Sequence, residues 1–172
     1  MSWWKTALYD TCSLITFDKL LQDRPSLSRW FPTKLLGLEV SLSADQMYAE
    51  TTKRVMEFVE LCALPTPPEL AKLLSSPGLS KAFSEADKLV FATAVGYKIP
   101  VVTGDKRLAK AVQSKGLYVG NMALILQELV MTNKLKSMSV EKILQALAER
   151  KDFLLGIPRP TWNDLKDYTF PD

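Results

Sequence analysis

Short apolar runs alternate with helical patterns along this chain of 172 residues, and that alternation restricts the fold more than any other feature. Four runs are expected as strands, at residues 7–9, 35–40, 99–103 and 117–119. A fifth is expected from Cys62, where prolines place it at a sheet edge or exclude it. Alternating strands and helices are typical of parallel sheets covered on both faces. The sequence therefore predicts an α/β fold, a three-layer α/β/α sandwich around a parallel sheet of four to five strands.

The helices are expected between these runs. The longest is expected to begin at Ser43 as N-cap, with Gln46 at the capping-box position, and to continue as one amphipathic helix to Cys62. Another is capped by Ser84 and ended by Gly96. Further helices are expected at residues 13–22, 68–74, 106–114, 122–132 and 140–150. No linker divides the chain, so we expect one domain over residues 1–155 and a tail over residues 156–172.

Composition restricts the chemistry. The sequence has no histidine, which excludes Ser-His-Asp and Cys-His triads and histidine zinc sites. Its net charge of +3 is too small to identify a nucleic-acid binder and does not exclude one. Two cysteines do not suggest a disulfide framework, and we expect a cytoplasmic location. No apolar run approaches membrane-spanning length, so no membrane is expected. A hydrolase of this composition would depend on carboxylates and a hard cation such as Mg²⁺.

Acidic residues stand where the expected strands end. Asp10 follows the first expected strand, at residues 7–9. Asp105 follows the fourth in chain order, at residues 99–103, whereas Asp87 and Glu50 lie on helices. In doubly wound sheets, ligands bind beyond the carboxyl ends of the strands, where the strand order reverses. If the first and fourth strands are neighbours there, Asp10 and Asp105 meet above the sheet. Asp87 and Glu50 could reach the same cleft from their helices.

Each acid also has a structural interpretation. Asp10 and Asp105 could be helix N-caps, and Asp87 could close a capping box with Ser84. Glu50 could belong to a solvated helix face. Taken together, however, three or four gathered carboxylates repel and raise one another's pKa. A fold that gathers them usually offsets this repulsion with a divalent cation, and Mg²⁺ and Mn²⁺ prefer such oxygen ligands.

Three stretches together resemble the PIN domain, the metal-dependent nuclease fold of VapC-type toxins and of many RNA-processing enzymes. They are YDTCSLI, the helix containing MYAET, and SEADKLVFATAVGYKIPVVTGDKRL. The best match runs from Glu85 to Leu108: an aspartate opens an alanine-rich helix, and a glycine, an apolar strand and Thr-x-Asp-x-x-Leu follow. The resemblance covers roughly Ala7 to Leu135.

The resemblance implies a ligand set for one or two Mg²⁺ or Mn²⁺ ions. Asp10, Asp87 and Asp105 would be metal ligands, with Glu50 as the helix-borne acid; Glu39 and Asp45 are rivals for the place of Glu50. The polar residues that orient the acids or contact the metal would be Thr11, Ser13 and Thr103, with ordinary turn and cap chemistry as the alternative. Phosphate contacts would come from Lys106 and Arg107, unless these form only a solvated helix face.

The function implied by this resemblance is a metal-dependent endoribonuclease that hydrolyses phosphodiester bonds, with single-stranded RNA as substrate. The same resemblance suggests a toxin of a toxin-antitoxin pair, with an antitoxin protein as partner, and a homodimer. The alternative is a PIN-like module that has lost catalysis and binds RNA or protein. A receiver domain of a response regulator also places aspartates after strands, but the paired acidic motif and the final lysine of that fold are not clear here.

Overall fold

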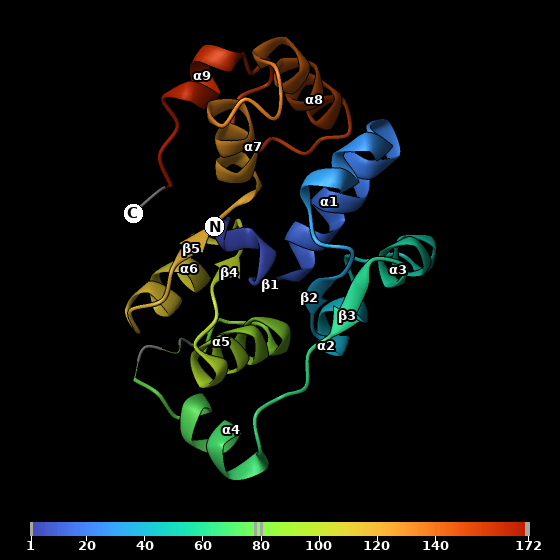
Figure 1. Ribbon diagram of the computed structural model, residues 1–172. Coiled ribbons are helices and arrows are strands. Elements are labelled where there is room, and N and C mark those ends of the chain that lie inside the picture. The colour runs from blue at the N-terminus through green and yellow to red at the C-terminus, as the bar shows by residue number, and fades with distance from the viewer. Residues whose placement is uncertain (1, 78, 80, 171–172) are drawn as a thin grey trace.

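The computed structural model describes residues 2–77, 79 and 81–170, and within them five short parallel strands form one sheet (Figure 1). The order across the sheet is β3-β2-β1-β4-β5. The strands are β1 (Leu8–Tyr9), β2 (Leu35–Gly37), β3 (Val59–Leu61), β4 (Val101–Val102) and β5 (Val119–Gly120). The expected parallel sheet is confirmed, and so is its five-stranded size in the described part of the chain.

The strand order reverses at β1. From β1 the chain moves outward to β2 and β3, then crosses back to the other side of β1 for β4 and β5. Strands β1 and β4 pair in register, with Leu8 opposite Val101 and Tyr9 opposite Val102. The boundary between β1 and β4 is therefore the switch point of the sheet, where α/β folds open a crevice for ligands.

Helices cover both faces of this sheet. The α-helices are α1 (Thr11–Asp23), α2 (Glu39–Leu42), α3 (Ala49–Met56), α4 (Pro67–Leu74), α5 (Glu85–Tyr97), α6 (Lys106–Gln113), α7 (Met122–Met131), α8 (Ser137–Glu149) and α9 (Trp162–Lys166). Two 3₁₀ helices, η1 (Trp3–Lys5) and η2 (Pro25–Trp30), flank β1 and α1. Most of these elements lie where the sequence predicts a helix.

The two central strands divide their side chains between two cores. Tyr9 and Val102 join the cluster that α1, α7 and α8 complete, whereas Leu8 and Val101 join the cluster that α5 and α6 complete. Because successive residues of a strand point to opposite faces, two residues per strand are enough to reach both cores. The expected three-layer α/β/α sandwich is confirmed.

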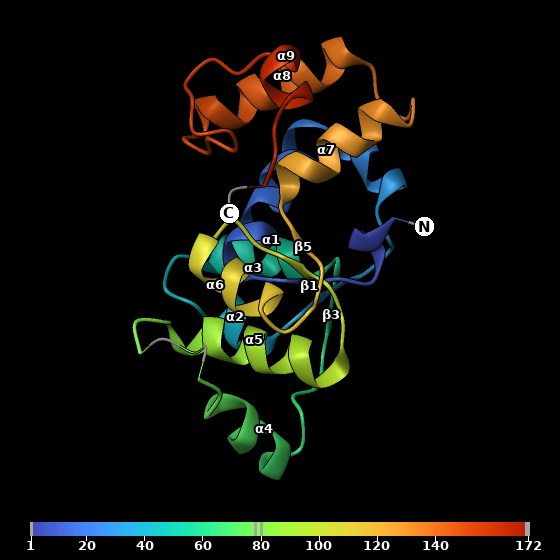
Figure 2. The same cartoon turned by 90° about the vertical axis from the view of Figure 1, so that its left-hand side faces the viewer.

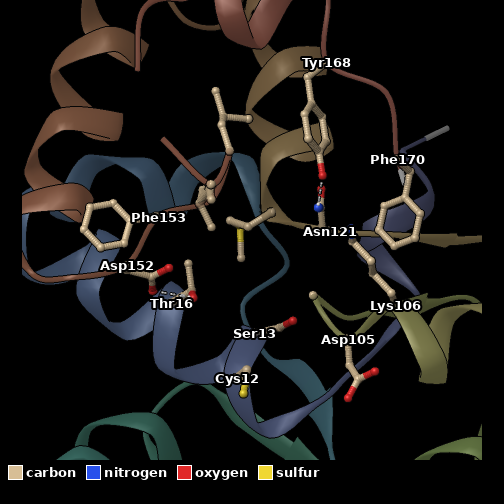
Figure 3. Close-up of a pocket in the computed structure, with 15 residues that line it drawn as sticks. Cys12, Ser13, Thr16, Asp105, Lys106, Asn121, Asp152, Phe153, Tyr168 and Phe170 are labelled. Carbon is tan, nitrogen blue, oxygen red and sulfur yellow. Dashed lines mark hydrogen bonds between the residues drawn. The ribbon is translucent and has the colours of Figure 1, made fainter. Parts of the chain in front are cut away.

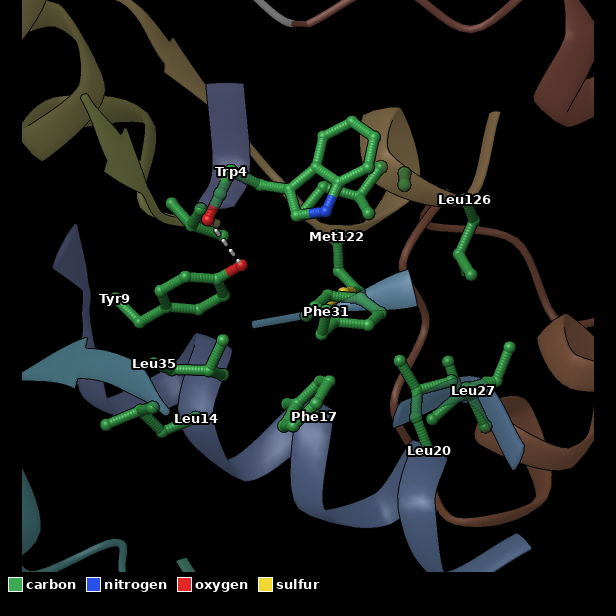
Figure 4. Close-up of a cluster of buried hydrophobic side chains, with 14 of the residues drawn as sticks. Trp4, Tyr9, Leu14, Phe17, Leu20, Leu27, Phe31, Leu35, Met122 and Leu126 are labelled. Carbon is green, nitrogen blue, oxygen red and sulfur yellow. Dashed lines mark hydrogen bonds between the residues drawn. The ribbon is translucent and has the colours of Figure 1, made fainter. Parts of the chain in front are cut away.

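The larger core is rich in aromatic side chains (Figure 4). The rings of Phe17 and Phe31 lie 4.5 Å apart, centroid to centroid. The hydroxyl of Tyr9 donates a 3.1 Å hydrogen bond to the carbonyl of Trp4, so this buried phenol has a partner. Burial raises the pKa of Tyr9 far above its ordinary value, and the phenol stays neutral in this core.

The prediction of a single long helix from Ser43 is wrong. The chain forms α2, a turn and α3 instead, and then enters β3. Ser43 ends α2, because its hydroxyl donates to the carbonyls of Glu39 and Val40, at 3.2 and 3.3 Å. Val59 pairs with Leu35 in the sheet and is buried. Strand pairing and burial of this β-branched residue outweigh the helical periodicity that predicted it in a helix.

The third strand lies slightly before its expected position. It ends at Leu61, and Cys62 contributes only an amide, which donates a 2.8 Å bond to the carbonyl of Gly37. Its place at the edge of the sheet agrees with the prolines that follow it. The helix expected to end at Gly96 continues one residue further, and Lys98 then takes a left-handed conformation with φ of 57°.

The C-terminal segment folds back on α7 and α8 (Figure 2). The side-chain amide of Gln127 on α7 donates to the carbonyls of Leu165 and Tyr168, at 2.8 and 2.9 Å. The amide of Trp162 donates to Glu141 on α8 at 3.0 Å. Residues 171–172 of the expected tail lie outside the described residues. In the described part of the chain, no helix combines the length and apolar character needed to cross a membrane.

Candidate functional site

Asp10 lies at the carboxyl end of the central strand, only 4% exposed. It is the N-cap of α1, and its carboxylate accepts a 2.8 Å bond from the amide of Ser13. Its second oxygen accepts a bond from the hydroxyl of Thr103. Burial raises the pKa of Asp10 above its ordinary value, and the nearby charge of Asp87 raises it further, against the lowering effect of these hydrogen bonds.

Asp105 lies at the carboxyl end of the neighbouring strand β4. It is the N-cap of α6, and one oxygen accepts bonds from the amides of Arg107 and Leu108, at 2.8 and 3.1 Å. Its own amide donates a 3.0 Å bond to the hydroxyl oxygen of Thr103. One buried hydroxyl thus joins Asp10 and Asp105 across the switch point. Both acids also cap helices, as their structural interpretation predicts.

Asp87 lies in the first turn of α5, where its amide donates to the hydroxyl of Ser84 at 3.1 Å. Its side chain is half-buried. The charge of Asp87 raises the pKa of both Asp10 and Cys12, so its carboxylate lies within electrostatic range of the end of β1. Asp10 and Asp105 therefore lie at the ends of neighbouring strands, and the charge of Asp87 acts on Asp10.

The fourth expected acid lies apart. Glu50 is exposed on α3, where its charge acts on Arg54. Its rivals are exposed as well: Glu39 lies beside an apolar groove formed with Leu61, and Asp45 lies in a turn. Among the described residues, none of these three acids is a charge that raises the pKa of Asp10 or Cys12.

Cys12 belongs to this site, although the sequence analysis assigned it no role. Its pKa is raised to about 11 by burial and by the charges of Asp10, Asp87 and Asp152, while a hydrogen bond with Gln46 lowers it. The thiol is therefore protonated at neutral pH and acts as a neutral group among carboxylates. Gln46, expected in a capping box, instead lies in the turn before α3 and brings a neutral amide to the site.

Asp152 is a further acid that the sequence did not indicate. It follows α8, and its carboxylate accepts bonds from the hydroxyl of Thr16 at 2.7 Å and from Lys19 at 3.3 Å. The ion pair with Lys19 balances its charge. Asp10 differs in this respect, because no basic side chain in the described part of the chain is paired with it. No sequence motif links Asp152 to α1; only the fold of the C-terminal segment brings it there.

The expected supporting residues hold α1 against the end of the sheet. The hydroxyl of Thr11 donates to the carbonyl of Ser41 at 3.1 Å, and that of Ser13 donates to the carbonyl of Val102 at 3.0 Å. These bonds fix the first turn of α1, and with it the position of Asp10. The two residues expected to contact phosphate, Lys106 and Arg107, are both exposed. Lys106 lines the pocket described next, whereas Arg107 does not.

A pocket of about 460 Å³ has Asp105 and Asp152 in its lining, which includes neither Asp10 nor Asp87 (Figure 3). One wall comes from α1 and the loop after β4. The opposite wall comes from α7 and the C-terminal segment. The labelled lining residues are Cys12, Ser13, Thr16, Asp105, Lys106, Asn121, Asp152, Phe153, Tyr168 and Phe170. The tail, which sequence analysis left without a role, therefore supplies aromatic side chains to the candidate site.

The side chains at this site are of the right chemical type for a hard divalent cation. Their positions, however, do not form a ligand set. Asp10, Asp87 and Asp105 offer carboxylate oxygens without a basic partner, as Mg²⁺ and Mn²⁺ prefer. Among residues 2–77, 79 and 81–170, however, no three acidic or thiol groups lie close enough together to hold a metal ion. A complete ligand set therefore requires Asp87 and Asp105 to turn their side chains toward Asp10.

Comparison with known proteins gives no family for this chain: no family model, no curated protein and no solved structure matches it. The geometry around Asp10 is therefore the ground on which a function is assigned.

Proposed function

We propose that this chain is a metal-dependent nuclease that hydrolyses phosphodiester bonds of single-stranded RNA, as its resemblance to PIN domains implies. One observation carries the proposal. Asp10 is buried at the switch point of the sheet, next to the charge of Asp87, and has no basic partner among the described residues. A buried carboxylate in this position is costly, and a divalent cation would relieve that cost.

Asp10, Asp87 and Asp105 would hold the ion, which when bound supplies a water of lowered pKa and polarises the phosphoryl group. The protein contributes position and charge. The amide of Ser13 and the hydroxyl of Thr103 fix the carboxylate of Asp10. Lys106, on the rim of the pocket, offers a positive charge to a substrate phosphate. Positioning and electrostatic stabilisation of this kind account for most of phosphoryl-transfer catalysis.

Cleavage of a labelled single-stranded RNA in the presence of Mn²⁺ tests the proposal. We expect Asp10→Asn and Asp105→Asn each to lower the rate at least about 100-fold, because each removes a charged ligand. Glu60→Gln is the matched control, since Glu60 is exposed on the edge strand β3 and belongs to no expected ligand set. Thermal unfolding of each variant checks that the fold is retained. Equal cleavage by the wild-type and all three variant proteins would contradict the proposal.

A second candidate function is a PIN-like module that binds RNA or protein without cutting. It is favoured by the separation of Glu50 and by the lack of an assembled three-acid group in the described residues. Calorimetric titration with Mn²⁺ discriminates between the two. Binding that disappears in Asp87→Asn supports the nuclease, whereas a wild-type protein that binds no Mn²⁺ supports the module. The toxin role, the antitoxin partner, the homodimer and the cytoplasmic location stay predictions from the sequence.

A further inference from the structure

A second polar pocket, of about 340 Å³, lies at the other end of α1, between η2 and the turn that joins α7 to α8. Four basic side chains line it: Arg24, Arg29, Lys134 and Lys136. No Asp or Glu of the described residues is among its lining residues. Along α1, the linings of the two pockets are separated by the stretch from Thr16 to Arg24, roughly 12 Å at about 1.5 Å per residue.

These four cations lack counter-charges. Within the described part of the chain, none of them is in an ion pair. Arg24 and Lys134 are half-buried, so part of their hydration is lost as well. The whole chain carries a net charge of only +3, and this pocket concentrates four positive charges in one place. Their mutual repulsion is a cost that a bound anion would remove.

An aromatic ring holds two of the cations in place. The guanidinium carbon of Arg29 lies 5.7 Å from the centroid of the Trp30 ring, and the ammonium nitrogen of Lys134 lies 5.6 Å from it. Arg29 also donates a 3.3 Å bond to the carbonyl of Ser26. Cation–π contacts at these distances restrict the two side chains. Charges fixed in this way lose less entropy when they bind a ligand.

The start of α8 adds to the positive electrostatic potential of this pocket. Lys136 is its N-cap and makes no side-chain capping bond, and the first turn contains no acid. The hydroxyl of Ser139, which also lines the pocket, is available as a donor. The positive end of the helix dipole therefore coincides with four basic side chains, whereas helix starts ordinarily carry acidic or capping residues.

We infer that this pocket binds phosphate groups in the backbone of a single-stranded nucleic acid. Its cations come from two chain segments, and two of them lie over one aromatic ring, so they present several positive charges to one extended ligand. Polynucleotides offer successive phosphates to such a surface, and release of their counterions drives binding. The inference rests on the proposed function only for the identity of the nucleic acid as RNA; it does not depend on the acids, the metal or cleavage.

Fluorescence anisotropy with a labelled RNA of about 12 nucleotides tests this inference in EDTA, where metal-dependent cleavage is absent. The test variant is Arg29→Gln/Lys134→Gln. The matched control is Lys72→Gln/Lys115→Gln, which removes the same charge from exposed positions on and after other helices. For the test variant we expect affinity to fall at least about tenfold and the salt slope to fall by about 1.4, at ~0.7 per phosphate contact of a single strand. The control should change affinity less than about twofold.

Other outcomes would overturn the inference. Equal losses in test and control variants would show a general charge effect. Should Arg29→Gln/Lys134→Gln unfold, Arg24→Gln/Lys136→Gln removes the other two cations and gives the same expectation. Displacement of the RNA by inorganic phosphate but not by chloride of equal ionic strength, with no difference between variants, would indicate a free-phosphate site elsewhere. Binding to phosphatidylserine vesicles without binding to RNA would indicate a membrane surface.

The two proposals fail separately. Wild-type protein that binds RNA through this pocket in EDTA and yet does not cleave it with Mn²⁺ would support the inference and contradict the nuclease. Asp10→Asn protein that keeps wild-type affinity would show that binding here is independent of the acids.

Discussion

The hydroxyl of Thr103 donates a hydrogen bond to the carboxylate of Asp10, across the boundary between β4 and β1. The same hydroxyl oxygen accepts a bond from the amide of Asp105. A single buried side chain therefore fixes both candidate acids at the switch point of the sheet. Its position follows from the register of β1 and β4, which brings Tyr9 opposite Val102 and so Asp10 opposite Thr103.

Replacing Thr103 by valine tests this relationship. Thr103→Val keeps the shape of the side chain but leaves the Asp10 carboxylate and the Asp105 amide without their partner. We expect the free energy of unfolding to fall by about 1–3 kcal/mol, the cost of unsatisfied buried groups. Urea denaturation measures the change. Thr132→Val, at the exposed end of α7, is the control and should cost no more than about 0.5 kcal/mol. Equal losses would contradict the role assigned to Thr103.

The raised pKa of Asp10 makes stability depend on pH in a definite direction. Because the folded-state pKa lies above the ordinary value of 3.8, the folded state binds the proton more tightly than the unfolded chain. The contribution of the Asp10 carboxyl to the free energy of unfolding is therefore largest below pH 3.8. It is lost as the pH rises from there through the folded-state pKa.

Asp10→Asn removes this titration while keeping a side chain that can cap α1. We expect the variant to be more stable than wild type at pH 7, by about 1 kcal/mol, as is common when a functional site is relieved of strain. The difference should shrink as the pH falls toward 3.8. Urea denaturation at several pH values measures it. A variant that is less stable than wild type at every pH would show that the hydrogen bonds of Asp10 outweigh its burial.

Two Arg–Asp pairs differ in the burial of their aspartate, whereas their arginines are exposed to a similar degree. Asp18 is only 3% exposed and accepts bonds from both the Nε and Nη2 atoms of Arg54, at 3.0 Å each. Asp23 and Arg150 make a similar two-bond pair near the surface. Arg54→Met leaves the Asp18 carboxylate without a counter-charge, with the Gln22 amide still donating to it at 2.9 Å, and should destabilise by about 1–3 kcal/mol. Arg150→Met should cost at most about 1 kcal/mol, because solvent screens that pair.

Thermal unfolding of both variants at low and high salt measures these effects. The loss in Arg54→Met should shrink less at high salt than the loss in Arg150→Met, because the Asp18 carboxylate is less accessible to salt ions than that of Asp23. Similar losses with similar salt dependence would show that the burial of Asp18 does not govern the strength of its pair.

Gly120 is required by its contact with Trp3. A Cβ atom at residue 120 would lie 2.5 and 2.6 Å from two atoms of the Trp3 ring. That ring also packs against Tyr118, with centroids 4.9 Å apart, which limits its freedom to move. Gly120→Ala should therefore destabilise the protein by about 1–3 kcal/mol. Gly104→Ala is the control, since nothing lies within 4 Å of the added atom.

The double variant Trp3→Leu/Gly120→Ala isolates this contact. We expect the double variant to lose less free energy of unfolding than the two single variants lose in sum, because the clash is absent once the ring is removed. Additive losses would place the cost of Gly120→Ala elsewhere, for example in the backbone of β5.

The side-chain amide of Gln127 holds the C-terminal segment on α7. Gln127→Leu removes its bonds to the carbonyls of Leu165 and Tyr168, each worth about 1 kcal/mol. We expect trypsin to cut after Lys166 about tenfold faster in this variant, because local opening becomes easier. Gln113→Leu, at the exposed end of α6, is the control. Unchanged cleavage would show that other contacts suffice to hold the segment.

The sequence predicted the fold well because its signals are local. Apolar runs, caps such as Ser84 and helix-ending glycines such as Gly96 identify most elements, and their alternation implies a parallel sheet. The error between Ser43 and Cys62 has a physical cause: α3 has a helical periodicity that continues into Phe58 and Val59, and only pairing with β2 decides that these residues leave the helix. Tertiary contacts of that kind are invisible in a single sequence.

The site was predictable only where strand ends determine it. Asp10 and Asp105 follow neighbouring strands, so their proximity depends on strand order alone. The prediction for Glu50 depended on one long helix, and in the structure a turn separates α2 from α3 there. Asp152, Tyr168 and Phe170 come from the segment after α8, which reaches the site by folding back across α7, and no local pattern specifies that path.

The strand order also has a practical consequence. One contiguous stretch of chain supplies β1, β2 and β3, a second supplies β4 and β5, and backbone pairing between the two stretches is confined to the β1–β4 boundary. A chain opened between α4 and α5 would therefore yield two polypeptides, each owning whole strands and one of the two central aspartates. Mixing them would reconstitute the candidate site only on reassembly, so any metal binding or cleavage of the kind proposed above would signal that the two halves have met.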